Sequence, residues 1–261
     1  MENLLLLFAA ISSGIILRHS GLFGPDSARV LNRLIIYFFI PVLALYHVPK
    51  ITLRYDLILL TLTPFLVFFA SLLFFQACSR FNNWDHATKA ALMLTAGISS
   101  TSFVGFPIFE LLYGPEGLAY GLILSLSGTI LVFNTAGVAT LFYLSTGQTN
   151  WKHLSRSVLL FPPFIAFVLA LALNLSALSY PQWLDQILGR LAAPFSVIAL
   201  LSIGMQVNFK TDPAQWKHLS WGLAYKLIIA PILVYLLVWL VLDVQSLVGQ
   251  ICILGAAIGP M

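Results

Sequence analysis

The chain has 261 residues, of which 60% are hydrophobic and only 8% are charged. A soluble domain carries about 25% charged residues, so these proportions exclude a water-covered surface and require lipid around the fold. The 13 Lys and Arg exceed the 9 Asp and Glu, but they are scattered between apolar runs, which argues against a nucleic-acid-binding face. Cys78 and Cys252 stand alone in apolar stretches, without the spacing of a disulfide framework or a zinc site.

The apolar runs predict an all-α protein that crosses the membrane several times, since a hydrocarbon core of about 30 Å needs roughly 20 helical residues. The first run is read as a helix and not as a signal peptide, because Glu2 replaces a basic start and Arg18 stands where small residues would mark cleavage. In chain order, the predicted helices cover residues 4–17, 34–48, 57–78, 87–113, 118–144, 158–178, 187–207, 221–242 and 247–261.

The basic residues predict the orientation. With the N-terminus outside, ten basic residues fall on the cytoplasmic side and three fall outside, which favours a multi-pass protein of the cytoplasmic membrane with the polar linker 145–157 inside the cell. In this assignment Lys226 reaches the cytoplasmic surface. The cytoplasmic set is Arg18, Arg29, Arg33, Arg80, Lys89, Lys152, Arg156, Lys210, Lys217 and Lys226, and the outer set is Lys50, Arg54 and Arg190.

The two halves of the chain resemble each other. Pro64 in the third predicted helix and Pro231 in the eighth each precede an apolar run with an aromatic residue. Five crossings before the linker would place the second copy upside down, as in the inverted repeats of many secondary transporters. The predicted organisation is a first repeat over 1–144, the linker 145–157, and a second repeat over 158–261. Residues 87–101 align with 247–261, so the second repeat ends at the position of the fourth helix of the first repeat. The second repeat is therefore expected to be truncated after about four helices, and the 261-residue protein is expected to transport poorly or not at all.

The fourth predicted helix is the candidate site. Four successive hydroxyl side chains lie among helix-weakening Gly and Pro residues at membrane depth. Backbone groups freed there must be satisfied by protein or by a wet cavity, so a discontinuous helix lining an anion site is predicted. The alternative is a kinked helix whose hydroxyls bond to their own carbonyls. The candidate substrate-binding residues are Gly97, Ser99, Ser100, Thr101, Ser102, Gly105 and Pro107, with Gly259 and Pro260 from the aligned second break.

The stretch from Ser100 to Pro107, followed by Leu112-Tyr113-Gly114, resembles the auxin efflux carrier family, whose fourth helix typically reads Asn-Thr-Gly-Phe-Leu-Gly-Leu-Pro and then Leu-Phe-Gly. In this chain Ser100 stands in place of the asparagine and Ser102 in place of a glycine. The resemblance implies ten helices in two inverted five-helix repeats, similar to bile acid sodium symporters. It also implies crossed discontinuous helices and carboxylate substrates such as malonate, malate or auxin-like acids.

Other polar residues are open to two interpretations. Glu110 is a candidate proton or cation ligand, or an acid that reaches water at the helix end. Asn134 is a second candidate for ion or proton coupling that could line the cavity, or it bonds between helices. Ser125 is interpreted as an outward-facing, structural residue. The five histidines lie near helix ends without ligand spacing, so no metal and no cofactor is expected.

The predicted function is a secondary transporter, or permease, that moves a small mono- or dicarboxylate by alternating access. An ion-coupled symporter, a channel-like pore of the same fold and a non-transporting truncated fragment are the alternatives. An enzyme is not expected, because neither a nucleophile with a base nor a metal set is found. The expected partners are the organic anion and the lipid bilayer, without nucleic acid, and a homodimer is left open.

Overall fold

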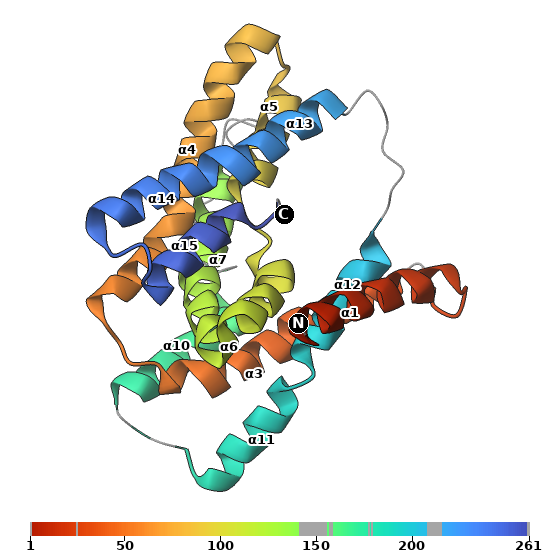
Figure 1. Ribbon diagram of the computed structural model, residues 1–261, viewed down its shortest axis with the longest axis vertical. Helices are drawn as coiled ribbons and strands as arrows, with labels where there is room; N and C mark the ends of the chain where they lie inside the picture. Colours follow the sequence, from red (N-terminus) through yellow and green to blue (C-terminus); the bar gives the residue numbers. More distant parts are fainter. Residues whose placement is uncertain are drawn as a thin grey trace. The chain divides into compact units, whose positions relative to one another are not determined.

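The computed structural model describes residues 2–24, 26–140, 156, 159–176, 178, 180–207 and 216–259. Every regular element in these ranges is a helix (Figure 1). Large apolar side chains such as Leu73 on α4 and Leu240 on α14 are exposed, as expected where lipid replaces water. Five helical segments are long and apolar enough to cross a membrane: Ser27–Lys50, Tyr55–Asn82, Thr101–Thr140, Gln182–Gln206 and Trp216–Val241. These segments support a multi-pass membrane protein.

Most described helices extend beyond the apolar runs that predicted them, because helix ends reach into polar residues. The second predicted helix, 34–48, lies within the segment Ser27–Lys50. The sixth is shorter than the predicted 158–178 and begins at Pro162. Proline lacks an amide hydrogen, so Pro162 and Pro163 suit a first helical turn. The predicted linker 145–157 lies outside the described residues, apart from Arg156.

The chain forms two compact units, and each unit combines elements from both halves of the sequence. Unit 1 comprises Met1–Thr52, Ser102–Leu122 and Phe161–Lys210. Unit 2 comprises Leu53–Thr101, Ile123–Leu160 and Thr211–Met261.

Unit 1 is built around a close pair of helices, α1 and α12, which run side by side (Figure 1). A methyl group on Gly14 or on Gly204 would come within 3.0 Å of backbone atoms of the other helix, so only glycine fits this approach. The helices of unit 1 are α1 (Glu2–His19), α2 (Ser27–Leu34), α3 (Ile40–His47), α6 (Phe106–Ile123, mostly in this unit), α10 (Pro162–Leu175), α11 (Gln182–Ala192) and α12 (Phe195–Gln206).

Asn174 joins α10 to the end of the segment Ser27–Lys50. Its amide nitrogen lies 3.0 Å from the carbonyl oxygens of Val48 and Pro49 and 2.7 Å from that of Ile51. These carbonyls lie in and just after the 3₁₀-helical turn Val48–Lys50, where the Val48 carbonyl also accepts a hydrogen bond from the Ile51 amide at 3.2 Å. One side chain therefore satisfies backbone groups from a segment more than 120 residues away in sequence.

Unit 2 packs a long helix, α4, against α5, α14 and α15. Phe68, Ile98 and Val132 form a buried apolar cluster in it. Its helices are α4 (Ile58–Asn82), α5 (His86–Gly97), α7 (Ile130–Val132), α13 (Trp216–Ala224), α14 (Ala230–Val241) and α15 (Leu247–Ala257), with π-helical turns η5 (Leu124–Thr129), η6 (Phe133–Gly137) and η8 (Tyr225–Ile229).

The segment Thr101–Thr140 has 40 residues, about 60 Å of helix and so about twice the hydrocarbon thickness. Gly114 divides it, with φ of 67° and ψ of −160°. Pro115 follows, so the break predicted between the helices 87–113 and 118–144 is present. The predicted end of the fifth helix at residue 144 lies outside the described residues.

Candidate functional site

The predicted interruption of the fourth helix is present, directly after Gly97. Helix α5 ends at Gly97, and Ile98 is extended, with φ of −116° and ψ of 129°. Helical structure resumes at the π-helical turn η4 (Thr101–Gly105) and continues into α6. The wide turn lies just before Pro107, whose ring would otherwise meet the carbonyl of the preceding turn. The gap between the two helices is therefore confined to residues 98–100.

Packing fixes the position of Gly97. A methyl group on this residue would lie less than 3.0 Å from the Ser71 hydroxyl oxygen and 3.1 Å from the Phe68 ring. Ser71 is fully buried, and its hydroxyl donates to the carbonyls of Phe68 at 2.7 Å and Met93 at 3.1 Å. The end of α5 thus lies directly against α4.

The hydroxyl groups at the break have different surroundings. Thr101 is 1% exposed, and its hydroxyl donates to the Ser125 hydroxyl at 3.0 Å. Ser99 and Ser100 are half-buried, and the Ser99 hydroxyl accepts a hydrogen bond from Lys226 at 2.6 Å. Within the part of the chain that the structure describes, the Ser100 hydroxyl has no hydrogen-bond partner. The hydroxyls of the break therefore differ, since those of Ser99 and Thr101 are bonded to other residues of unit 2 and that of Ser100 is not.

The end of α15 meets this break. After Ala257 the chain becomes extended at Ile258, with φ of −60° and ψ of 135°. The Ser100 amide donates to the Gly259 carbonyl at 3.1 Å, so the segments that follow α5 and α15 share a backbone hydrogen bond. Pro260, the other predicted residue of this second break, lies outside the described residues.

Two sequence interpretations are corrected here. Lys226 does not reach the membrane surface: its side chain is 0% exposed and its ammonium group binds Ser99, so the cytoplasmic basic set falls to nine. Ser125 does not face outward, since it is 0% exposed and accepts the Thr101 hydrogen bond. In both cases a residue from another part of the sequence folds against the break, which local patterns do not reveal.

The remaining predicted site residues are distributed between the units. Ser102, Gly105, Pro107 and Glu110 belong to unit 1, whereas Gly97, Ser99, Ser100, Thr101 and Gly259 belong to unit 2. Glu110 is half-buried, and its carboxylate accepts a hydrogen bond from the Ser196 hydroxyl of α12.

Asn134 is in unit 2, but its amide donates to the Ile130 carbonyl of its own helical segment at 2.9 Å. This bond gives Asn134 a local structural role.

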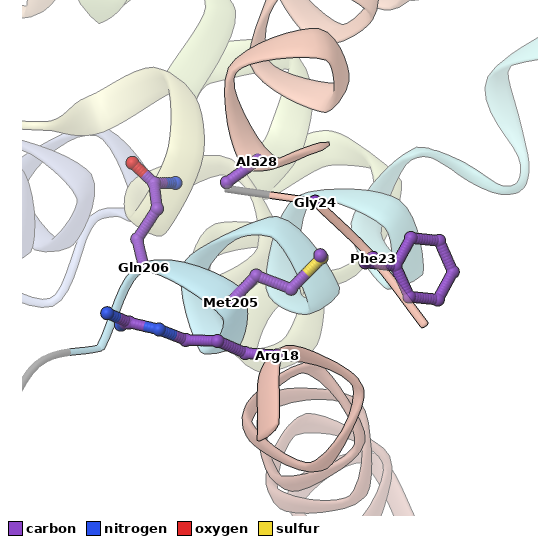
Figure 2. A pocket seen from close by; sticks show the side chains of 6 residues that line it. All are labelled: Arg18, Phe23, Gly24, Ala28, Met205 and Gln206. Atoms are coloured by element: carbon purple, nitrogen blue, oxygen red, sulfur yellow. The ribbon is translucent and has the colours of Figure 1, made fainter. Parts of the chain in front are cut away.

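Unit 1 contains a pocket of about 550 Å³ that no sequence pattern predicted. Figure 2 shows Arg18, Phe23, Gly24, Ala28, Met205 and Gln206 around it. The Arg18 guanidinium donates to the Val207 carbonyl at 2.6 Å, so one of its donors is already used by the protein. The pocket contains none of the predicted site residues. Among the described residues, no group of three or more His, Cys, Asp or Glu could hold a metal ion.

The sequence is similar to proteins described as transporters. A family model described as a membrane transport protein matches residues 1–150. An uncharacterized transporter of Methanothermobacter thermautotrophicus is 27% identical over 212 residues, which cover 80% of this chain and 68% of the relative. Another, from Escherichia coli K12, is 27% identical over 252 residues, covering 91% and 77%.

A third uncharacterized transporter, from Methanocaldococcus jannaschii, is 22% identical over 217 residues, covering 80% and 70%. The family model and these relatives are all described as transport proteins. Because the family model matches more than half of the 261 residues, this chain belongs to the membrane transport protein family, the auxin efflux carrier family that its fourth helix resembles.

Proposed function

We propose that this protein is a secondary transporter for a small organic anion, a mono- or dicarboxylate, and that the break at residues 98–100 forms part of its substrate site. The observation that carries the proposal is the half-buried Ser100 hydroxyl, which no described residue binds, at a helix interruption inside a membrane-spanning protein. Hydroxyl donors in a setting shielded from water bind carboxylates strongly, because water competes less for both partners.

Alternating access is supported by the composition of the units. Unit 1 contains the first two helical segments of the first repeat, which are α1 to α3. It also contains the corresponding segments of the second repeat, which are α10 to α12. Unit 2 takes α4 and α5 from the first half and α13 to α15 from the second. Equivalent parts of two repeats gathering in the same compact body are what an inverted-repeat carrier requires. The proposed orientation places the N-terminus outside the cytoplasmic membrane, with nine basic residues inside and three outside.

The proposal is tested by ligand binding to the purified protein. A panel of mono- and dicarboxylates that includes malonate and malate should contain acids that raise the thermal unfolding midpoint. Ser100→Ala should weaken binding of the stabilising acid about tenfold or more while leaving the unliganded midpoint nearly unchanged, because it removes a hydrogen bond to a charged ligand. Thr101→Val should lower both affinity and stability, since Thr101 is buried and supports the break through Ser125.

Matched controls are available in the same unit. Ser220 is exposed and its hydroxyl donates to the Trp216 carbonyl of its own helix, so Ser220→Ala should bind like the parent. Thr95 is exposed on α5 and bonds to the Ala91 carbonyl, which makes Thr95→Val the control for Thr101→Val. Ser100→Ala binding with parental affinity would exclude the break as the substrate site.

A further inference from the structure

Lys226 is an ionisable residue at an unusual place. It lies in the π-helical turn η8 within the segment Trp216–Val241, and its side chain is 0% exposed. Moving an ammonium group out of water into an apolar interior is costly unless other groups replace its hydration. The lysine must therefore be stabilised by its surroundings.

No carboxylate supplies that stabilisation among the described residues. The ion pairs in this part of the chain join Asp26 to Arg29, Lys50 to Asp185, and Arg54 to Asp56. The ammonium nitrogen of Lys226 lies 2.6 Å from the Ser99 hydroxyl oxygen, a neutral acceptor two residues beyond the end of α5. One neutral hydrogen bond does not balance a buried unit charge.

Helix ends supply a negative potential at this position. Helix α5 ends at Gly97 and α15 ends at Ala257, and both helices pack against η8, which carries Lys226. The bond from the Ser100 amide to the Gly259 carbonyl brings the segments beyond these two ends together. The C-terminal end of a helix carries about half a negative charge, so two converging C-terminal ends favour a cation between them.

We infer that the Lys226 ammonium serves as the protein's own cation at the meeting point of α5 and α15. In many transporters with interrupted helices, C-terminal helix ends and unwound carbonyls hold a dissociable sodium ion or proton. Here a covalently attached cation takes that place, so the site does not need sodium. A direct contact between Lys226 and substrate is not favoured, because no part of its side chain is exposed and Ser99 covers its ammonium group.

The inference is tested first without any substrate. The thermal unfolding midpoint of the parent should be the same in sodium chloride and in N-methyl-D-glucamine chloride. Lys226→Ala removes the ammonium group with its three outer methylenes, and it should unfold at a lower temperature. n-Propylammonium has the shape of the removed group and should raise the midpoint of this variant by about 3 °C or more, while leaving the parent unchanged.

Two further variants keep the test decisive. Lys89 is half-buried on α5 in the same unit, and its ammonium group donates to Gln76 at the surface, so Lys89→Ala should not respond to n-propylammonium. Lys226→Met fills the space without a charge and should not respond either. A parent midpoint that rises in sodium chloride would overturn the inference, as would a Lys226→Ala midpoint indifferent to n-propylammonium. If Lys226→Ala does not fold, the sodium response of the parent decides.

The transport consequence rests on the proposed function, and its failure is separable. In proteoliposomes, uptake of malonate or malate should be equal when sodium is replaced by N-methyl-D-glucamine, and sodium-dependent uptake would overturn the inference. Absence of uptake of every acid in the panel would contradict the proposed function, whereas the substrate-free unfolding measurements would still decide the role of Lys226.

Discussion

The chain interrupts its helices in two ways that sequence patterns do not distinguish. After Gly97 the interruption is buried, and Ser71, Phe68 and the Gly259 carbonyl lie against it. At Gly114 the interruption is open: apart from its chain neighbours and the backbone of its own helix, no atom lies within 4 Å of the position where a side chain would begin. Gly97 has an ordinary helical backbone, whereas Gly114 has φ of 67°.

The difference shows that one glycine is required by its neighbours and the other by its own backbone. At Gly97 the obstacle to a side chain belongs to another helix, so the requirement is tertiary. At Gly114 the φ and ψ values lie in a region nearly restricted to glycine, so the requirement is local. A buried interruption with polar partners is a candidate site, while an open one is a turn.

The largest effect is expected for Gly97→Ala. The added methyl group would press on the hydroxyl of Ser71, which is fully buried and held by two hydrogen bonds. Overpacking of this kind should lower the free energy of unfolding by about 2 kcal/mol, visible as a fall in the unfolding midpoint. In Gly97→Ala with Ser71→Gly, part of this loss should return, because the obstacle is removed.

Gly222 provides the control for this substitution. It is a buried glycine within α13 of the same unit, and a methyl group there would meet its nearest atom at an ordinary 3.6 Å. Gly222→Ala should leave stability unchanged or raise it by about 0.5–1 kcal/mol, since alanine favours helix. Equal midpoints for the Gly97 and Gly222 variants would contradict the tertiary explanation.

A smaller effect is expected for Gly114→Ala, about 1–2 kcal/mol of backbone strain. No second substitution nearby should restore the loss, because no side chain obstructs the site. Gly24→Ala is the control, since Gly24 also has open space around it but no positive φ. Denaturant or thermal unfolding of Gly114→Ala and Gly24→Ala should separate backbone strain from the general effect of replacing a glycine. Equal losses of stability in the two variants would refute the local explanation.

The smallest effect on stability is expected at the start of α5, where Asp85 caps the helix. Hydrogen bonds from the Thr88 side chain and the Thr88 amide hold the pKa of the Asp85 carboxyl below its usual range. A lowered carboxyl pKa contributes stability above the unfolded value, which is lost as the pH falls through the folded value. Asp85→Ala should therefore lower the unfolding midpoint slightly at pH 7, and the difference from the parent should begin to shrink near pH 4 and shrink further as the pH falls through the lowered folded pKa.

Asp85→Asn separates the charge from the cap. Asparagine caps helices about as well as aspartate, so this variant should keep most of the stability and lose the pH dependence. A parent-to-alanine difference that persists unchanged in acid would show that ionisation of Asp85 contributes nothing. The comparison contrasts the exposed start of α5 with its buried end.

Much of the fold followed from the sequence because lipid imposes a simple rule on it. Apolar runs located the membrane helices, and the local concentration of Gly and hydroxyl residues located the break after Gly97. The interruption at Gly114-Pro115 was also predictable, since it depends on local turn chemistry. The position of Gly259 beside Ser100 was reached through the alignment of the two halves.

Lys226 and Ser125 were misjudged for a common reason. A lysine in an apolar run is equally consistent with a side chain that reaches the surface and with one buried against a partner. The partner of Lys226 is Ser99, which lies 127 residues away in sequence. Ser125 is 24 residues from Thr101 and has no local signal of that contact. Tertiary partners, and not the residue's own surroundings in sequence, decide both positions.

The pair of α1 and α12 has a consequence for how this sequence can evolve. The crowding at Gly97 comes from a side chain, so a change there can be compensated by a second change at Ser71. At Gly14 and Gly204 the crowding comes from main-chain atoms of the opposite helix, including Leu201 and Ile11 carbonyl oxygens. No substitution removes a main-chain atom. Descendants that keep this helix pair are therefore confined to glycine at both positions, whatever else in their sequences drifts.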